Sequence, residues 1–187
     1  MALSQDFRDL LAAFGARQVR YLLIGGYAVA FHAKPRFTKD LDLWVEPTEE
    51  NLARAVAALS DFGAPPQALE DLVSSRDDEI IWFGVPPARV DLLKRVPGVA
   101  FGAAYARRVE AKWEDVGVAV IGRDDLIRAK EAAGRPQDLL DAANLAAPAD
   151  TPADGSDVTS TSTGKMLVDA ARGGAESPAK DGCGGQR

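Results

Sequence analysis

Residues 24–45 read IGGYAVAFHAKPRFTKDLDLWV, an apolar run that ends in two glycines, followed by a strand-like segment with two aspartates. Successive side chains of a strand point to opposite faces. Asp40 and Asp42 are therefore expected on one face, with the leucine between them turned into the core. Two like charges held so close raise each other's pKa. The pattern predicts either a positive partner between the two carboxylates or open exposure of both to water.

The segments on either side of this stretch alternate between helical and strand-like patterns. Ser4 and Thr48 are typical N-caps, while Gly63 and Gly134 are typical helix ends. We expect a helix after Ser4 and further helices at 27–33, 49–62, 98–108, 123–133 and 135–147. We expect strands at 20–25, 40–45, 78–84, 88–94 and 116–122, the third and fourth of them forming a hairpin.

These elements predict an α/β (α+β) fold, a mixed β-sheet flanked by helices with two helices closing the ordered part. Residues 1–147 are expected to form this domain. Residues 148–187 are rich in Pro, Gly, Ser, Thr and Ala and nearly free of large apolar side chains. Such a segment buries too little surface to offset the entropy of ordering, so we expect a disordered tail.

Composition narrows the classes of protein that remain. The chain of 187 residues is 47% hydrophobic, has a net charge of -6 and contains one cysteine, Cys183, which excludes a disulfide framework within the chain. No apolar run approaches the roughly 20 residues that span a bilayer, and the N-terminus lacks the pattern of a signal peptide. We therefore expect a cytoplasmic protein with no membrane partner. The acidic total disfavours a general nucleic-acid coat protein but leaves room for a local basic patch.

A third aspartate, Asp91 in RVDLLK, lies in a second strand-like setting. If its strand neighbours that of Asp40 and Asp42, three carboxylates converge into an oxygen-rich site that suits Mg²⁺ or Mn²⁺. A pair of such ions can hold the attacking and leaving oxygens of a phosphoryl displacement.

The two glycines supply the other half of this candidate site. Gly25 and Gly26 lead from a strand into a helix, whose N-terminal N–H groups are expected to bind phosphate. Arg36 and Thr38, in the loop that follows, are candidates for contacting a triphosphate or its metal. Asp-x-Asp alone and Gly-Gly alone are weak evidence for a phosphate and metal site, but their order along the chain is more specific than either motif.

Together these motifs resemble the signature of the nucleotidyltransferase superfamily. The segment IGGYAVAFHAKPRFTKDLDLWV and the later RVDLLK are similar to the minimal nucleotidyltransferases, most closely to the AbiEii-like toxin group. LIRAKEAAGRPQDLLDAANL resembles the part of that group where a lysine precedes an Arg-x-x-Asp segment. The resemblance covers roughly residues 21–145.

The resemblance implies a Mg²⁺-dependent transfer of a nucleoside monophosphate from an NTP to a hydroxyl of RNA, such as a tRNA 3′ end, or of a protein. It implies that Asp40, Asp42 and Asp91 bind metal and are catalytic. Gly25, Gly26 and Lys130 would contact the nucleotide phosphates, and Asp138 would orient Lys130 or Arg135. It also suggests one half of a toxin–antitoxin pair, with a cognate antitoxin as partner.

Other interpretations remain open at this point. Asp40 and Asp42 also fit a water-exposed strand pair, Lys130 fits a solvated helix residue, and Asp138 fits an interaction with its own helix dipole. The chain as a whole also fits a non-catalytic nucleotide-binding regulator, a sugar transferase with an Asp-x-Asp metal site, or a protein-interaction domain without a metal.

Overall fold

The computed structural model describes residues 4–33 and 38–147. Its centre is a six-stranded sheet with the order β3-β4-β2-β1-β6-β5. The strands are β1 (Tyr21–Leu23), β2 (Asp40–Val45), β3 (Ile80–Phe83), β4 (Arg89–Leu93), β5 (Val109–Trp113) and β6 (Val116–Val120). The β1–β6 and β2–β4 pairs are parallel and the other three pairs are antiparallel, so the sheet is mixed.

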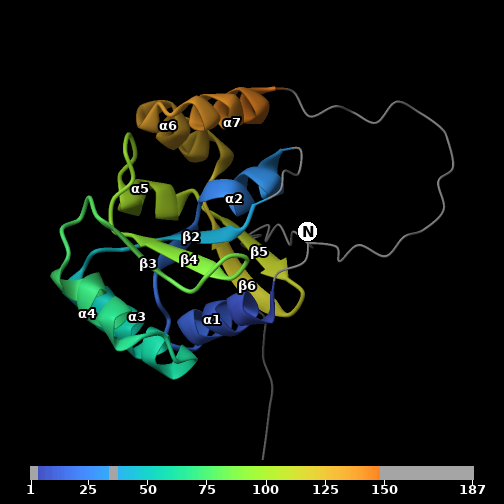
Figure 1. The fold of residues 1–187 in the computed structure, drawn as a ribbon. Helices are drawn as coiled ribbons and strands as arrows, with labels where there is room; N and C mark the ends of the chain where they lie inside the picture. Colours follow the sequence, from blue (N-terminus) through green and yellow to red (C-terminus); the bar gives the residue numbers. More distant parts are fainter. Residues whose placement is uncertain (1–3, 34–37, 148–187) are drawn as a thin grey trace, which may run out of the picture.

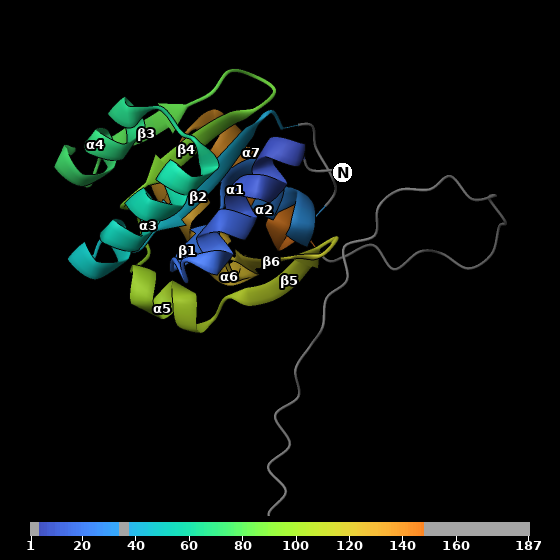
Figure 2. The ribbon, with the colours of Figure 1, turned by 90° about the horizontal axis from the view of Figure 1, so that it is seen from below.

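Helices cover both faces of this sheet (Figure 1). The helices are α1 (Gln5–Ala16), α2 (Gly25–His32), α3 (Glu49–Phe62), α4 (Pro66–Ser74), α5 (Phe101–Ala106), α6 (Arg123–Ala133) and α7 (Pro136–Ala146). Figure 1 shows α1, α3 and α4 below the sheet and the other four above it, and Figure 2 shows α1 and α3 in front when the molecule is seen from below. The α/β class, the mixed sheet flanked by helices and the two closing helices are thereby confirmed.

The alternation of side chains along β2 sorts polar from apolar groups. Leu41 and Leu43 are fully buried on the face that packs against the lower helices. Asp40 and Asp42 lie on the other face, as does Trp44, whose ring packs edge-on against Phe101 of α5. The sheet therefore presents both aspartates to the layer that contains α2, α6 and α7.

Local signals in the sequence explain most element boundaries. The Ser4 hydroxyl accepts the Phe7 amide at 3.3 Å, and the Thr48 hydroxyl accepts the Asn51 amide at 3.4 Å, as expected for N-caps. Gly63 ends α3 in a left-handed conformation, and its N–H bonds to the Leu59 carbonyl.

Several expectations about the elements were wrong. Helix α2 begins at Gly25 itself, and the helix expected at 98–108 is limited to Phe101–Ala106. Strand β5 and helix α4 were not predicted, although β5 alternates exposed and buried side chains and α4 begins with Pro66 at its first position. The hairpin of β3 and β4 is confirmed. The division into a domain at 1–147 and a tail at 148–187 stays a prediction, because the tail lies outside the described residues.

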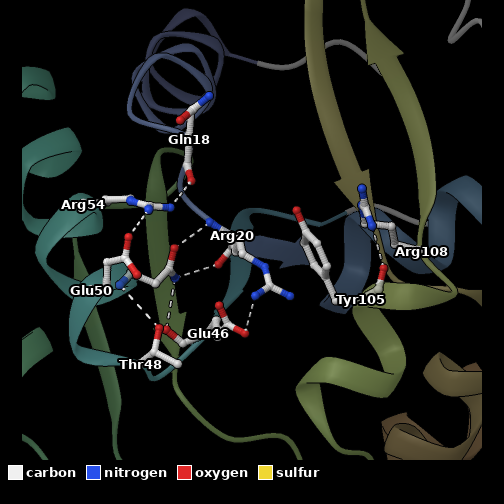
Figure 3. Close-up of polar contacts among 9 residues, drawn as sticks. Gln18, Arg20, Glu46, Thr48, Glu50, Arg54, Tyr105 and Arg108 are labelled. Atoms are coloured by element: carbon white, nitrogen blue, oxygen red, sulfur yellow. Dashed lines mark hydrogen bonds and ion pairs between the residues drawn. The ribbon is translucent and has the colours of Figure 1, made fainter.

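A polar network closes the end of the sheet that lies away from the aspartates (Figure 3). The Arg20 guanidinium pairs with Glu46 at 2.8 Å and lies 4.5 Å from the centre of the Tyr105 ring. Arg108 covers the same ring at 4.0 Å. These contacts fix the start of β1 against the end of β2 and therefore stabilise the register of both strands.

Within the described part of the chain, no helix is both long enough and apolar enough to cross a bilayer.

Candidate functional site

The turn from β1 into α2 is built around the side chain of Asp42. The Ile24 amide donates to the Asp42 carbonyl at 3.0 Å, which ties the turn to β2. Gly25 has φ +64°, and a Cβ at this position would lie 1.9 Å from Oδ2 of Asp42. Only glycine meets both conditions, since other residues rarely adopt this φ and any side chain would overlap the carboxylate.

Gly26 allows a second close approach, from the segment before β2. A Cβ on Gly26 would lie 2.5 Å from the hydroxyl oxygen of Thr38. The Thr38 hydroxyl in turn donates to the Asp40 carbonyl at 3.5 Å, and the Gly26 amide donates to the carboxylate of Asp42. The first turn of α2 therefore directs an N–H group at a negative charge, as expected for a helix N-terminus.

The parallel pairing of β2 and β4 brings the third aspartate to the site. Asp42 is the Cα partner of Asp91, and Asp40 is the partner of Arg89. The three aspartates were expected to converge only if these two strands are neighbours, and the pairing shows that they are. Asp91 and Asp40 both raise the pKa of Asp42 by charge repulsion.

The Asp91 carboxylate is held by Arg89 of the same strand. Arg89 donates from Nε to Oδ1 at 2.7 Å and from a terminal nitrogen to Oδ2 at 3.1 Å. The same guanidinium lies 5.1 Å from the centre of the exposed Trp82 ring on β3. A bidentate pair of this kind is among the stronger side-chain interactions, so Asp91 has a cationic partner in this structure.

Asp42 and Asp91, but not Asp40, line a cavity of about 140 Å³ beneath the closing helices. Its lining includes Gly25, Asp42 and Asp91 from the sheet side and Lys130, Arg135 and Asp138 from the helix side. Residues that are far apart in the sequence thus meet in one place, and four of them are candidate site residues.

Lys130 reaches this cavity from α6 and is almost buried. Its ammonium lies 2.7 Å from Oδ1 of Asp138 and 3.1 Å from Oδ2 of Asp141, both buried side chains of α7. Arg135 also pairs with Asp138, at 2.5 Å, and together the two cations lower the pKa of that carboxyl. The interpretation of Lys130 as a solvated helix residue is therefore wrong, and the expected link of Asp138 to Lys130 and Arg135 is confirmed.

The pKa of Asp42 is raised to about 6. Burial is the largest cause, followed by repulsion from Asp91, while the positive charge of Lys130 acts in the opposite direction. Burial disfavours the charged form of a carboxyl group, and neighbouring carboxylates add to this effect. The site thus concentrates negative charge that the protein's own cations offset only in part.

The donor set fits a hard divalent cation. Oδ1 of Asp40 is buried without a hydrogen-bond partner. In the neighbouring Asp42, burial and nearby negative charge raise the pKa, because nearby cations do not fully offset them. Carboxylate oxygens are the ligands that Mg²⁺ and Mn²⁺ prefer. Among the residues that the structure describes, no group of three or more His, Cys, Asp or Glu side chains is spaced to hold a metal ion. The Asp91 carboxylate is paired with Arg89, so its side chain would have to change rotamer before it could bind the same metal ion as Asp40 and Asp42.

Two further residues bear on the original expectations. Arg36, a candidate phosphate ligand, lies outside the described residues. His32 donates a hydrogen bond from Nε2 to the Ile121 carbonyl at 2.7 Å, and burial lowers its pKa, which agrees with a packing role.

Sequence reasoning missed Asp141 and the pairing of Arg89 with Asp91. Asp141 follows Asp138 by three residues and so shares its helix face, and Arg89 precedes Asp91 by two residues and so shares its strand face. Both spacings are visible in the sequence, but the contact of Asp141 with Lys130 on another helix is not.

Comparison with solved structures finds proteins of similar fold, one of them an adenylyltransferase. The crystal structure of the lincosamide antibiotic adenylyltransferase LnuA with lincomycin bound aligns with a TM-score of 0.47 and 14% sequence identity. The alignment covers 77% of this chain and 96% of that one. No protein-family model matches the chain, and no curated protein matches its sequence.

Proposed function

We propose that the protein is a nucleotidyltransferase that transfers a nucleoside monophosphate from an NTP to a hydroxyl group. One observation carries this proposal: a single cavity is bordered by the glycine turn, by Asp42 and Asp91 from parallel neighbouring strands, and by the buried Lys130. In phosphoryl transfer, backbone N–H groups and a lysine bind the phosphates, and carboxylates bind the metal ion.

Asp40 and Asp42 are the proposed metal ligands, joined by Asp91 once its carboxylate leaves Arg89. Bound Mg²⁺ or Mn²⁺ would neutralise charge on the phosphate oxygens of the substrate. The unpartnered oxygen of Asp40 and the raised pKa of Asp42 support this assignment, because both features mark negative charge without sufficient compensation.

The nucleotide phosphates are proposed to lie against the first turn of α2. Gly25 lines the cavity, while Gly26 is buried against Thr38 and its N–H donates to Asp42. Thr38 would donate to the same ligand once its hydroxyl leaves the Asp40 carbonyl. Lys130 supplies a positive charge from the opposite side of the cavity, oriented by Asp138 and Asp141. Preorganised charges of this kind act on the transition state without having to reorganise during the reaction.

In the proposed reaction the acceptor oxygen forms a bond to the α-phosphorus, and the bond from that phosphorus to the bridging oxygen of the β-phosphate breaks. Pyrophosphate leaves with the bonding electrons, and the hydroxyl proton is lost to a base. Asp91 is the proposed base, because it lines the cavity beside Asp42.

A non-catalytic nucleotide-binding role is the second candidate, and the contact between Arg89 and Asp91 favours it. A bidentate guanidinium keeps Asp91 from accepting a proton or a metal. This role predicts that NTP binds and raises the melting temperature while no pyrophosphate is released.

The test is a transfer assay with purified protein, Mg²⁺ and each labelled NTP, offered total bacterial RNA in one series and protein extract in another. Asp42→Asn is the inactive comparison, and since it removes a buried charge its loss of activity would not reflect unfolding. Label incorporated by the wild type and lost in the variant supports transfer. Nucleotide binding without incorporation supports the second candidate, and the absence of binding contradicts both.

The cellular setting remains a proposal as well. An intracellular toxin–antitoxin role, with an RNA or protein acceptor and a cognate antitoxin, rests on the resemblance of the sequence motifs to the AbiEii-like group.

A further inference from the structure

Strand β3 forms one edge of the sheet and carries unusually exposed apolar side chains. It is the outermost strand at this edge among the residues that the structure describes. Ile80 and Trp82 are 50% and 58% exposed, on the same side of the sheet as Asp91, which is the Cα partner of Trp82. An open edge with exposed apolar residues can pair with another chain, and natural proteins usually protect such edges.

A groove of about 600 Å³ runs along this edge, between β3 and helix α4. It is lined by Ile81 and Trp82, which point to opposite faces of the strand, so the groove follows the edge itself and not one face. Ile80 lines both this groove and the cavity that contains Asp42 and Asp91. A ligand in the groove would therefore lie directly beside the candidate site.

The groove is acidic. Its lining includes Asp71 and Glu79 and, within the described part of the chain, no lysine or arginine. Asp77 and Asp78 add two exposed carboxylates just before β3. Two cations lie among these groups: Arg76 pairs with Asp78 at 3.4 Å and with Glu79 at 3.1 Å, and Lys94 lies 3.7 Å from Asp77. With Asp71, four carboxylates therefore face two cations, and the balance stays negative. Such a surface repels the phosphates of RNA and attracts a positively charged partner.

We propose that the edge of β3 and its groove bind an extended, lysine- or arginine-containing segment of a protein, which adds to the sheet as a further strand and presents its hydroxyl to the site. Main-chain hydrogen bonds along the edge would supply affinity, and the exposed Trp82 and the acidic lining would supply specificity. The inference rests on the proposed function in one respect, that the bound segment is the acceptor of the nucleotide.

The first test measures binding alone. The probe is a short fluorescein-labelled peptide in which lysine alternates with valine around a central serine, followed by fluorescence anisotropy. Two matched peptides are compared with it: one has glutamate in place of lysine, and the other has alternate backbone amides methylated so that it cannot pair with a strand. Only the unmethylated lysine peptide should bind, and it should shift the tryptophan emission, because Trp44 and Trp113 are buried while Trp82 is exposed.

Variants of the groove locate the binding. The double variant Asp71→Asn/Glu79→Gln should weaken the lysine peptide about fivefold, since it removes two carboxylates from the groove lining. The matched control is Glu110→Gln/Asp115→Asn, which removes the same charge from β5 and its turn at the opposite edge of the sheet and should leave affinity unchanged. Equal weakening by both doubles would overturn the inference, because it would reflect net charge alone.

Three other results would overturn it: no binding of the lysine peptide, equal binding of the methylated peptide, or tighter binding of a single-stranded RNA of similar length. The transfer assay separates the two proposals. Label transferred to RNA and to no protein would remove the inference and leave the proposed function intact. Peptide bound as expected, with no nucleotide transferred to anything, would support docking at β3 and remove the proposed function.

Discussion

Replacing Asp42 with asparagine should make the metal-free protein more stable while abolishing transfer. Asparagine keeps the size of the side chain but removes a charge that is buried between Asp40 and Asp91. The fold therefore tolerates the ionised carboxylate of Asp42 at a cost in stability. Stability lost at functional residues is a common consequence of this kind of requirement.

The size of the effect follows from the shift in the pKa of Asp42 from 3.8 to about 6. Each unit corresponds to 1.36 kcal/mol, so ionised Asp42 lowers the free energy of unfolding by about 2–3 kcal/mol. Below pH 4 the carboxyl is protonated in both the folded and the unfolded chain, and the penalty is absent. Between pH 4 and 6 the unfolded chain binds fewer protons than the folded one, so the stability from this group falls as the pH rises.

The assay is urea unfolding of wild type and Asp42→Asn at a series of pH values, in EDTA and again with Mg²⁺. At pH 8 in EDTA the variant should gain about 2–3 kcal/mol, or roughly 5–10 °C in melting temperature for a domain of this size. At pH 4 the difference should nearly vanish. Mg²⁺ should stabilise the wild type and leave the variant unchanged, because only a ligand that binds the folded state adds stability.

A matched substitution checks the sign. Asp61 is an exposed carboxylate paired with Arg17, and this pair lowers its pKa. Asp61→Asn should therefore destabilise the protein slightly at pH 8, opposite to Asp42→Asn. A variant at Asp42 that is no more stable than wild type at pH 8, or whose gain persists unchanged at pH 4, would refute the argument from burial and repulsion.

Three other substitutions test the rest of the site. Gly25→Ala should lower the free energy of unfolding by more than the roughly 1 kcal/mol expected for a left-handed conformation alone, because its Cβ would meet the Asp42 carboxylate. Gly63→Ala, which has open space around it, should lower it by only that amount. Equal losses for the two variants in urea unfolding would contradict the close approach of Gly25 to Asp42. Lys130→Met should destabilise by about 3 kcal/mol, because it removes the buried ammonium shared by Asp138 and Asp141 and leaves Asp138 with Arg135 alone. Adding Asp141→Asn should recover part of that stability, and the absence of any recovery would argue against the pairing. Arg89→Gln should raise the affinity for Mg²⁺ severalfold in calorimetry, because it removes the cation that holds Asp91, and unchanged affinity would show that Asp91 takes no part in metal binding.

The sequence carried most of the information about where the aspartates lie. Alternation in DLDLWV placed Asp40 and Asp42 on one face, and a similar pattern placed Asp91 in a second strand. Whether those strands are neighbours depends on pairing between residues about fifty positions apart, which periodicity does not specify. The register that sets Asp42 against Asp91 is therefore a result of the three-dimensional structure.

The charge partners were harder to predict than the positions. Lys130 looks like a solvated residue because Glu131 follows it, yet its side chain enters the cavity and meets two buried carboxylates of α7. That arrangement depends on how α6 and α7 pack, with the polar face of α7 turned inward. Helical spacing shows that Asp138 and Asp141 share a face, but only packing decides which way that face points.

The distribution of charge in the site explains why two aspartates stand side by side on one strand. Lys130 is shared with Asp138 and Asp141, and Arg89 is committed to Asp91, so neither cation fully compensates Asp40 and Asp42. The consequences are visible in the unpartnered Asp40 oxygen and in the raised pKa of Asp42. A fold selected for stability alone would replace one of these carboxylates with a neutral side chain, because buried unpaired charge is costly. The proposed cationic ligand would supply the missing positive charge, and the pH dependence of Asp42→Asn with and without Mg²⁺ measures how strongly it binds.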